Sequence, residues 1–399
     1  MDFKLTEKQL ALKKEFEDFF REEMKNAPPE YGKGGLEGIY ATEEGFQFHR
    51  SMARKLGAKG WLSRAWPKEA GGEGAPLIEQ LLFNEAKDSL RAPGVDMFGI
   101  GMFAPTLIIA ANEEQKKRLL EPIAKGEVMY CQGWSEPDAG SDLASLTTTA
   151  IKEGDNYIVN GQKIWTTGGH KADAMFLLAR TNTEEKRGKG LSVFHVDMKA
   201  PGVEVRPILY MDGAHLYNEV FFKDVKIPIK DLIGTENGGW NLTRETMNFE
   251  RSSVGMFAEG KNCLDELIEY TKNTKRDGKY LSENPIIRQK IAKLYIDLEM
   301  GHALAYKIAW LQEAGGLIFA ASAASMAKLF GSELLQRISN FGTEIMGLYG
   351  QLPKSKWSPL EGSMVEIYQF CMGMNIAAGT SEIQKNIIAW VGLGLPRFK

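Results

Sequence analysis

Residues 157–165 read YIVNGQKIW and mark the point where the character of the chain changes. Two runs rich in β-branched and aromatic residues flank Asn160-Gly161, and an Asn-Gly pair between such runs predicts a β-hairpin with a two-residue turn. Further β-prone runs, separated by turn residues, follow at 175–179, 191–196, 203–208 and 219–225. We therefore predict a small antiparallel β domain over residues 129–236.

Helical patterns lie on both sides of this segment. From residue 5 to about 125, apolar residues recur at helical spacing, and Thr6 is placed to cap the first helix. Past Trp240, three stretches are typical of long helices: 253–274, 285–313 and 316–341. The fold class is therefore α+β, with an N-terminal all-α domain at 1–128, the β domain at 129–236 and a C-terminal helical domain at 237–399.

Composition excludes several classes of protein. The 399 residues are 43% hydrophobic and 25% charged, as in folded globular proteins, and the net charge of −3 gives no strong field toward nucleic acid. The three cysteines are few, far apart and odd in number, which argues against disulfides and favours a reducing cytoplasm. The N-terminus lacks the apolar core of a secretory signal, and no stretch approaches the roughly 20 apolar residues of a membrane span.

Common cofactor and metal motifs are missing from the sequence. No Gly-x-Gly-x-x-Gly follows a predicted strand, and neither a Walker A sequence nor His-Glu-x-x-His occurs. The five histidines show no metal-ligand spacing. We therefore expect neither a Rossmann-type dinucleotide site nor a metal site.

Three segments carry residues suited to binding chemistry. The loop 134–142, WSEPDAGSD, can present backbone N–H groups to an anion or a heterocycle, but it also fits an ordinary turn. In 164–169, IWTTGG, a Trp beside paired Thr residues can stack on a flat ring, or it can close a hairpin within the core. Segment 378–384, AGTSEIQ, is a helix start that fits a pyrophosphate or a plain cap.

With these segments, the chain resembles the acyl-CoA dehydrogenase family. Residues 133–142, 160–167 and 379–388 resemble three of its signatures in the family's order, and Trp66-Pro67, Gly71-Gly72 and 347–350 match as well. The resemblance covers nearly the whole chain. It implies an N-terminal helical domain, a middle β domain and a C-terminal four-helix bundle, and an oxidoreductase with FAD between the last two domains.

The resemblance also assigns roles to particular residues. Trp165 is expected to flank the flavin, and Thr167 is expected to reach its N5 edge. The loop with Trp134, Ser135 and Ser141 is expected to contact the flavin or its pyrophosphate. Thr380 and Glu382 are expected to contact the ADP part of the FAD. Arg276 and Gly347 are expected to contact the FAD of another subunit across an interface.

The family's reaction implies a carboxylate base. That base removes the Cα proton of an acyl-CoA thioester while a hydride leaves Cβ for flavin N5, which gives an enoyl-CoA. The thioester carbonyl must be polarised as charge develops on it. The electrons are expected to pass to an electron-transfer flavoprotein.

One departure from the family pattern concerns this base. Well-known members have Tyr-Glu-Gly-Thr where this chain has Ala377-Ala378-Gly379-Thr380, and alanine cannot accept a proton. Other members place the base on an earlier helix before an Arg, which makes Glu250 the candidate base here. A Glu paired with a nearby Arg is the competing interpretation. Asp96 is a second candidate for the base, and Arg251, Ser141 and Met102 are candidate substrate-binding residues, although Met102 also fits an ordinary core.

A second departure is the long segment 351–370, which contains Trp357 and two prolines. It resembles the branch with steroid-side-chain and pimeloyl-CoA dehydrogenases, which implies a cyclic, branched or dicarboxylic acyl group. The expected assembly is a homotetramer or homodimer, or a hetero-oligomer in which one chain type has the complete site. The alternative is thus a catalytically silent flavin-binding subunit. A DNA-binding relative is disfavoured by the near-neutral charge, and a flavin oxidase relative stays open.

Overall fold

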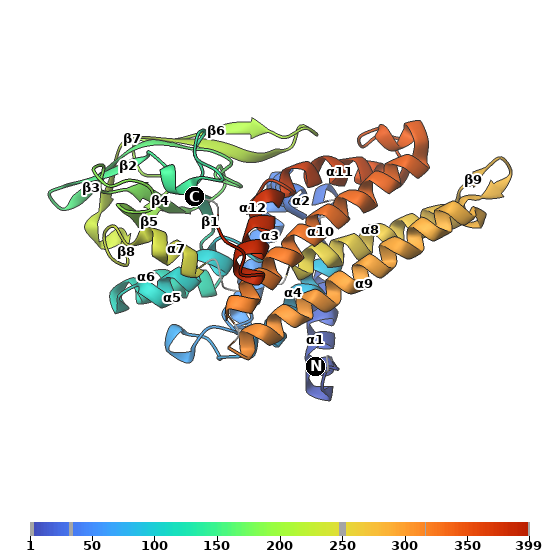
Figure 1. The fold of residues 1–399 in the computed structure, drawn as a ribbon, viewed down its shortest axis with the longest axis horizontal. Helices are drawn as coiled ribbons and strands as arrows, with labels where there is room; N and C mark the ends of the chain where they lie inside the picture. Colours follow the sequence, from blue (N-terminus) through green and yellow to red (C-terminus); the bar gives the residue numbers. More distant parts are fainter. Residues whose placement is uncertain (1–3, 32–34, 247–252, 316, 398–399) are drawn as a thin grey trace. The chain divides into compact units, whose positions relative to one another are not determined.

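The computed structural model describes residues 4–31, 35–246, 253–315 and 317–397. The chain divides into two compact units. Unit 1 comprises Met1–Lys25, Pro76–Ala92 and Glu250–Lys399, and unit 2 comprises Asn26–Ala75 and Pro93–Phe249. The helical ends and the central sheet confirm the α+β class predicted from the sequence (Figure 1). The three-domain boundaries at 128 and 236 remain a proposal.

Unit 2 is built on an eight-stranded sheet (Figure 1). The strand order is β6-β7-β3-β2-β4-β5-β8, and β1 pairs with β4 in parallel. The ladders along this order are antiparallel, except for one parallel bridge between β2 and β4. The strands are β1 (Tyr130–Gly133), β2 (Thr149–Glu153), β3 (Asn156–Lys163), β4 (Ala174–Arg180), β5 (Leu191–Asp197), β6 (Val203–Leu209), β7 (His215–Pro228) and β8 (Leu232–Ile233).

The hairpin predicted at Asn160-Gly161 is wrong. These residues lie inside β3, where the pairing with β7 shifts register between Val159 and Gly161. Gly161 has a φ of 148°, and a Cβ on it would come within 2.5 Å of Thr148 Oγ1. The Asn-Gly pair therefore forms a β-bulge at a close backbone approach, which is the other conformation that such a glycine permits.

The sheet of unit 2 is buried on both faces. Along β4, alternate side chains join two separate hydrophobic clusters, because successive residues of a strand point to opposite faces. One cluster includes Met175 and Leu177, and the other includes Phe176 and Leu178. Phe176's cluster also takes residues from the helices α5 (Ala104–Ala110), α6 (Glu113–Ala124) and α7 (Gly239–Thr246). Unit 2 also contains α2 (Gly35–Tyr40) and α3 (Glu43–Ala58).

Unit 1 is helical and includes a four-helix bundle. Three long helices and α11 pack side by side (Figure 1): α8 (Val254–Asn273), α9 (Pro285–Glu313), α10 (Leu317–Met346) and α11 (Ser363–Met374). A Cβ on Gly301 of α9 would come within 2.1 Å of the Phe257 ring of α8, so this glycine allows the two helices to approach closely. The third long helix reaches Met346, five residues beyond its predicted end at 341.

Two N-terminal helices also belong to unit 1. They are α1 (Glu7–Glu23) and α4 (Leu77–Ser89), and Thr6 caps α1 through a capping box, as predicted. Phe16 and Phe20 of α1 are fully buried against Phe83 of α4. In the part of the chain that the structure describes, no helix is long and apolar enough to cross a membrane.

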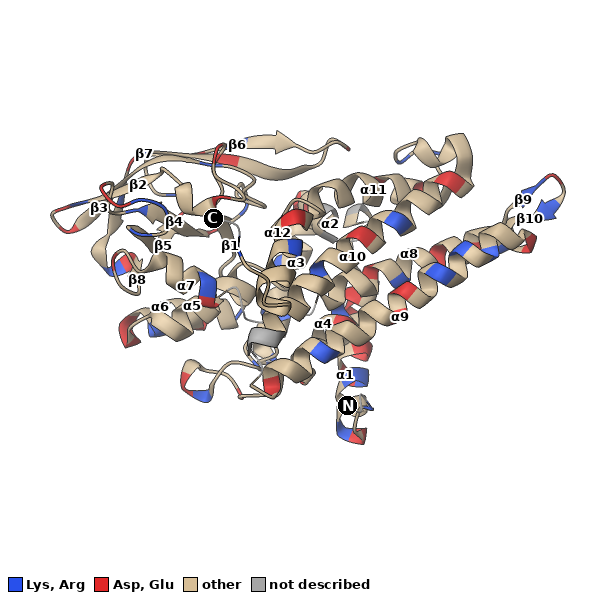
Figure 2. Cartoon of the chain, in the orientation of Figure 1, with Lys and Arg blue, Asp and Glu red and all other residues tan. Residues whose placement is uncertain are grey.

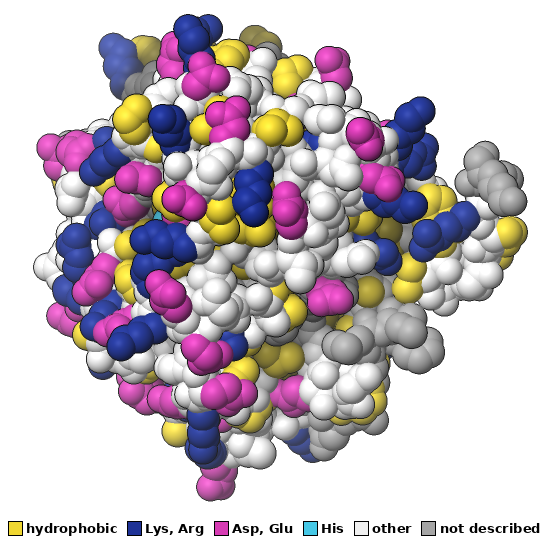
Figure 3. Space-filling model, turned by 90° about the vertical axis from the view of Figure 1, so that its left-hand side faces the viewer, with side chains coloured by type: hydrophobic (Ala, Val, Ile, Leu, Met, Phe, Trp, Pro, Cys, Tyr) yellow, Lys and Arg dark blue, Asp and Glu magenta, His cyan; other side chains and the backbone are white. Residues whose placement is uncertain are grey.

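Charged side chains of both signs are distributed over the two units. Figure 2 shows acidic and basic residues interspersed along α8, α9 and α10. A small basic group sits on the hairpin of β9 (Lys275–Arg276) and β10 (Lys279–Tyr280). Basic and acidic side chains also lie side by side on the face drawn in Figure 3.

Candidate functional site

A buried ion pair anchors the loop that follows β1. Lys163, at the end of β3, is fully buried, and its Nζ donates to Glu136 Oε1 at 2.8 Å and to the Trp134 carbonyl at 3.1 Å. Glu136 also accepts hydrogen bonds from the backbone N–H groups of Thr147 and Thr148 at 2.7 and 2.8 Å. The two ends of the loop 134–148 are therefore held on one strand, while Ser141 in the middle is exposed.

The same pair is ionised at neutral pH. Burial alone raises the pKa of Glu136, but Lys163 and the hydrogen bonds from Thr148 and Thr147 outweigh it and lower the pKa to about 2. Burial lowers the pKa of Lys163 to about 8, although Glu136 opposes that shift. A buried, mutually satisfied pair of this kind fixes loop geometry rather than transferring protons.

Trp165 stands in an unusual conformation next to this loop. Its φ is 59°, a left-handed value that costs a bulky L-residue roughly 1–2 kcal/mol, and its side chain is 56% exposed. The backbone on both sides is held, because Ile164 N–H donates to the Ser135 carbonyl and Thr166 N–H donates to the Asn218 carbonyl at 2.9 and 3.0 Å. Such strain persists only where the surroundings impose it, and it is concentrated at functional sites.

These residues provide features that suit a flavin. Among the described residues, Trp134 Nε1 and Thr166 Oγ1 are buried without a hydrogen-bond partner. The exposed Trp165 indole offers an aromatic face for a flat ring, and Thr167, which is half-buried, follows it directly. An isoalloxazine has both a broad aromatic face and a polar edge. The residues present in unit 2 therefore fit the ring that the resemblance implies.

Asp96 and Met102 lie close to β1 in the same unit. Asp96 accepts hydrogen bonds from the backbone N–H groups of Tyr130 at 2.7 Å and Phe98 at 3.0 Å. Burial raises the pKa of Asp96 to about 6, although these bonds oppose the shift. Met102, half-buried, accepts a hydrogen bond at Sδ from Gln132 at 3.4 Å. Because both Asp96 oxygens already accept backbone hydrogen bonds, the geometry favours an anchoring role over a catalytic one.

The predicted ADP segment lies in unit 1. Ala378 is exposed in a left-handed conformation, with a φ of 52°. Thr380 caps α12 (Ser381–Ile387) by accepting from Ile383 N–H at 3.2 Å, and Glu382 is exposed in the first turn. The Gly379 carbonyl accepts from Lys328 Nζ at 2.8 Å, which ties the segment to α10.

Arg276 and Gly347 come together in unit 1, at the basic hairpin. Arg276 Nη2 donates to the Ile345 carbonyl at 2.7 Å, two residues before Gly347. Gly347 has a φ of 65° and ends α10, and the next residue, Leu348, is 83% exposed. The two residues that the resemblance placed at a subunit interface thus share one exposed end of the bundle.

The structure does not describe the segment that carries the candidate base. Glu250 and Arg251 lie outside the described residues, so their roles stay predictions. Residues that the sequence reasoning missed include Lys163 and Asn218. Neither residue lies in a motif that marks it as buried, because a lysine or an asparagine on a β-strand is ordinarily exposed.

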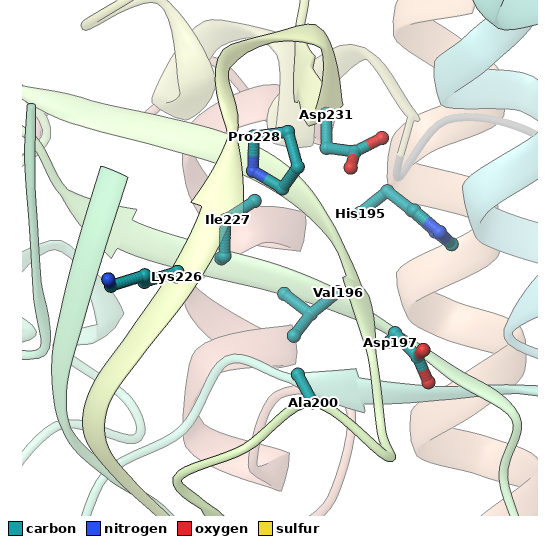
Figure 4. Close-up of a pocket in the computed structure, with 8 residues that line it drawn as sticks. All are labelled: His195, Val196, Asp197, Ala200, Lys226, Ile227, Pro228 and Asp231. Atoms are coloured by element: carbon teal, nitrogen blue, oxygen red, sulfur yellow. The ribbon is translucent and has the colours of Figure 1, made fainter. Parts of the chain in front are cut away.

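A small cavity of about 70 Å³ lies in unit 2, between β5 and the end of β7. Figure 4 shows His195 and Asp231 on one side of it, with Lys226 pointing away from both. His195 is held by Tyr130, whose hydroxyl is 3.1 Å from Nδ1. The predicted site residues are not among those that line this cavity.

Comparison with known proteins decides the family. Models of the acyl-CoA dehydrogenase N-terminal, middle and C-terminal domains match residues 6–127, 131–225 and 237–393. Acyl-CoA dehydrogenase FadE26 of Mycobacterium tuberculosis is 33% identical over 414 residues, which cover 100% of this chain and 99% of the relative. The chain belongs to the acyl-CoA dehydrogenase family. The resemblance seen in the sequence is thereby confirmed, and the acyl-CoA dehydrogenase is an oxidoreductase that uses a flavin.

Two solved structures share the fold of this acyl-CoA dehydrogenase over its whole length. The ChsE4–ChsE5 complex from Mycobacterium tuberculosis includes a chain that is 32% identical, with a TM-score of 0.88 and full coverage of both chains. The Tcur3481–Tcur3483 steroid acyl-CoA dehydrogenase includes a chain that is 28% identical, with a TM-score of 0.87 and the same coverage.

Proposed function

We propose that this acyl-CoA dehydrogenase uses FAD to remove two hydrogens from Cα and Cβ of an acyl-CoA thioester and so forms an enoyl-CoA. The observation that carries the proposal is the exposed, left-handed Trp165, which is followed directly by the buried Thr166, whose Oγ1 has no hydrogen-bond partner among the described residues. When bound, the flavin supplies the hydride acceptor. An electron-transfer flavoprotein is the proposed partner that would accept the electrons.

Each role in the proposal belongs to a named residue. Trp165 covers one face of the ring, and Thr167 donates or accepts at its edge. Trp134, Ser135 and Ser141 line the same loop, while Thr380 and Glu382 hold the ADP part and Arg276 and Gly347 reach a neighbouring subunit's cofactor. The Cα proton goes to Glu250, because Ala378 has no group that can take it.

The proposal also concerns the kind of acyl group that the substrate carries. The Tcur3481–Tcur3483 protein is described as a steroid acyl-CoA dehydrogenase, which supports a cyclic substrate for this chain. Arg251 and Ser141 are proposed to contact the CoA thioester and Met102 to line the acyl pocket. The cytoplasmic location that the cysteine usage favours remains part of the proposal.

A panel of thioesters tests this function. The purified chain is assayed with straight-chain, branched, dicarboxylic and steroid-ring acyl-CoA substrates, an artificial electron acceptor and mass detection of the product. We expect a product two mass units lighter from the cyclic substrate, with kcat/KM at least tenfold above that for the straight chain. Equal turnover of a straight-chain thioester would contradict the cyclic substrate class.

A second candidate function rests on Ala378. A chain without the usual carboxylate can serve as a flavin-binding but silent subunit, and the ChsE4–ChsE5 structure is a complex of two named chains. In that case the panel gives no product with the isolated chain and gives product when a partner chain is added. A homotetramer or homodimer that turns over alone would exclude the silent subunit.

A further inference from the structure

Asn218 of β7 holds the strained segment at Trp165 from two directions. It is fully buried, its backbone carbonyl accepts from Thr166 N–H at 3.0 Å, and its side-chain Nδ2 donates to the Thr166 carbonyl at 2.9 Å. A single residue thus satisfies both backbone groups of the residue between Trp165 and Thr167. The Thr166 carbonyl can only accept, so the side-chain atom next to it must be the amide nitrogen.

Two histidines fix the orientation of that amide. The Asn218 Oδ1 lies 2.8 Å from His215 Nε2, which must therefore donate, and Nδ2 lies 3.2 Å from His170 Nδ1, which must accept. The two imidazole rings stack with centroids 3.8 Å apart and planes 19° from parallel. Burial, His215 and Lys171 together lower the pKa of His170 to about 4, so the ring stays neutral and keeps its acceptor.

The other side of the segment is closed by α2. A Cβ on Gly168 would come within 2.2 Å of the Tyr40 hydroxyl, and the Tyr40 ring lies 5.6 Å from the His170 ring. Gly168 N–H donates to the Leu216 carbonyl at 2.9 Å. The segment from Trp165 to Gly168 is therefore held on β7 by its backbone, while the Trp165 side chain itself is more than half exposed.

We propose that Asn218 is a positioning residue for the reaction: through the Thr166 backbone, it holds Trp165 and Thr167 in the conformation that receives the flavin, and the His170–His215 stack fixes its amide. The inference rests on the proposed function, which places the flavin at Trp165. It assigns Asn218 no contact with the flavin or the substrate. Loss of the Asn218 amide nitrogen is therefore expected to free the Trp165 side chain.

The main variant is Asn218→Asp. This change keeps the shape and the acceptor that His215 needs, and it replaces the amide nitrogen that donates to the Thr166 carbonyl and to His170 Nδ1 with a second oxygen. A stability control is Val225→Ala, on the same strand, where Val225 is fully buried and pairs with Val159. This control lowers the stability of the sheet without touching the hydrogen bonds of Asn218. Effects that appear in both variants are therefore effects of stability.

The first measurement does not involve the flavin. The protein, which has eight tryptophans, is labelled with 5-fluorotryptophan, and the fluorine resonance that disappears in Trp165→Phe is assigned to Trp165. In flavin-free protein, we expect this resonance to shift or broaden in Asn218→Asp and to stay in place in Val225→Ala. An unchanged Trp165 resonance in Asn218→Asp would overturn the positioning role.

The second measurement separates this inference from the proposed function. FAD is titrated into the same flavin-free proteins, and we expect Asn218→Asp to raise the dissociation constant about tenfold or more, because two buried hydrogen bonds that hold the segment are lost. If the Trp165 resonance moves and FAD affinity stays at the wild-type value, the positioning role stands and the flavin placement at Trp165 is wrong. If both change in Val225→Ala as well, the role assigned to Asn218 is wrong.

Discussion

Lys163 and Glu136 show how much one residue pair contributes to the site. Replacing Lys163 with Met keeps a long, unbranched side chain but leaves a buried carboxylate without its charged partner, which typically costs about 3–5 kcal/mol. We expect Lys163→Met to lower the free energy of unfolding by an amount in this range, measured by urea denaturation. Lys171→Met is the control, because the pair of Lys171 with Glu43 is more exposed. A loss below 1 kcal/mol in Lys163→Met would contradict the anchoring role.

The same carboxylate predicts a pH dependence. The folded-state pKa of Glu136, about 2, lies below its ordinary value of 4.5, so ionised Glu136 stabilises the fold above about pH 4.5. This contribution, of order 3 kcal/mol, is lost as the pH falls through 4.5 towards 2. The difference in unfolding free energy between wild type and Glu136→Gln is therefore expected to narrow between about pH 6 and pH 3. A constant difference in unfolding free energy between the two proteins over that range would contradict the stabilising role of ionised Glu136.

Among single residues, those that lie in a recognisable sequence motif could be predicted from the sequence. The motif around Trp165 and Thr167 and the substitution at Ala378 could be recognised without coordinates. Lys163 and Asn218 could not, because their roles arise from partners 27 and 52 positions away in the chain. A lysine or asparagine on a strand is by default an exposed residue, and only the pairing of strands reveals that these two are buried.

Among the elements, β4 ends in a residue that organises two loops. Arg180, which is 9% exposed, donates five hydrogen bonds to the carbonyls of Ala144, Leu146, Glu185, Arg187 and Lys189. We expect Arg180→Met to open the loop 182–190 and to speed cleavage by trypsin at Lys186, Arg187 and Lys189 at least tenfold. Arg206→Met is the control, because Arg206 pairs with Glu204 on an exposed strand. Equal cleavage rates in the two variants would show that Arg180 does not hold the loop.

The types of the helices and strands could be predicted from the sequence, but the pairing and packing of some of them could not. The five β-prone runs and the long helices appear where apolar periodicity placed them. The Asn160-Gly161 pair misled, because a glycine with positive φ serves a turn and a bulge equally well, and only the close approach of Thr148 distinguishes them. The grouping of α1 and α4 with the C-terminal helices also depends on long-range packing, which local periodicity does not report.

At the scale of the whole molecule, the exposed end of the helical bundle in unit 1 predicts an interface between subunits. Leu348 and Tyr349 are 83% and 58% exposed directly after Gly347, and neighbouring large apolar side chains in solvent are typical of interfaces. We expect the double change Leu348→Asp and Tyr349→Asp to lower the mass measured by light scattering and to weaken FAD binding. Leu209→Asp, at a residue 65% exposed on β6, is the control. An unchanged mass in the double variant would remove this surface from the interface.

One anaerobic experiment tests the central claim most directly. The claim is that this chain itself dehydrogenates an acyl-CoA, and that its base is Glu250 and not residue 378. The purified protein is mixed with its best thioester, and flavin bleaching is followed in wild type, Glu250→Gln and the control Glu245→Gln. We predict bleaching in wild type and in the control, and a rate 10²–10⁴-fold lower in Glu250→Gln at equal FAD content, as loss of a general base implies. Bleaching of Glu250→Gln at the wild-type rate would contradict the account.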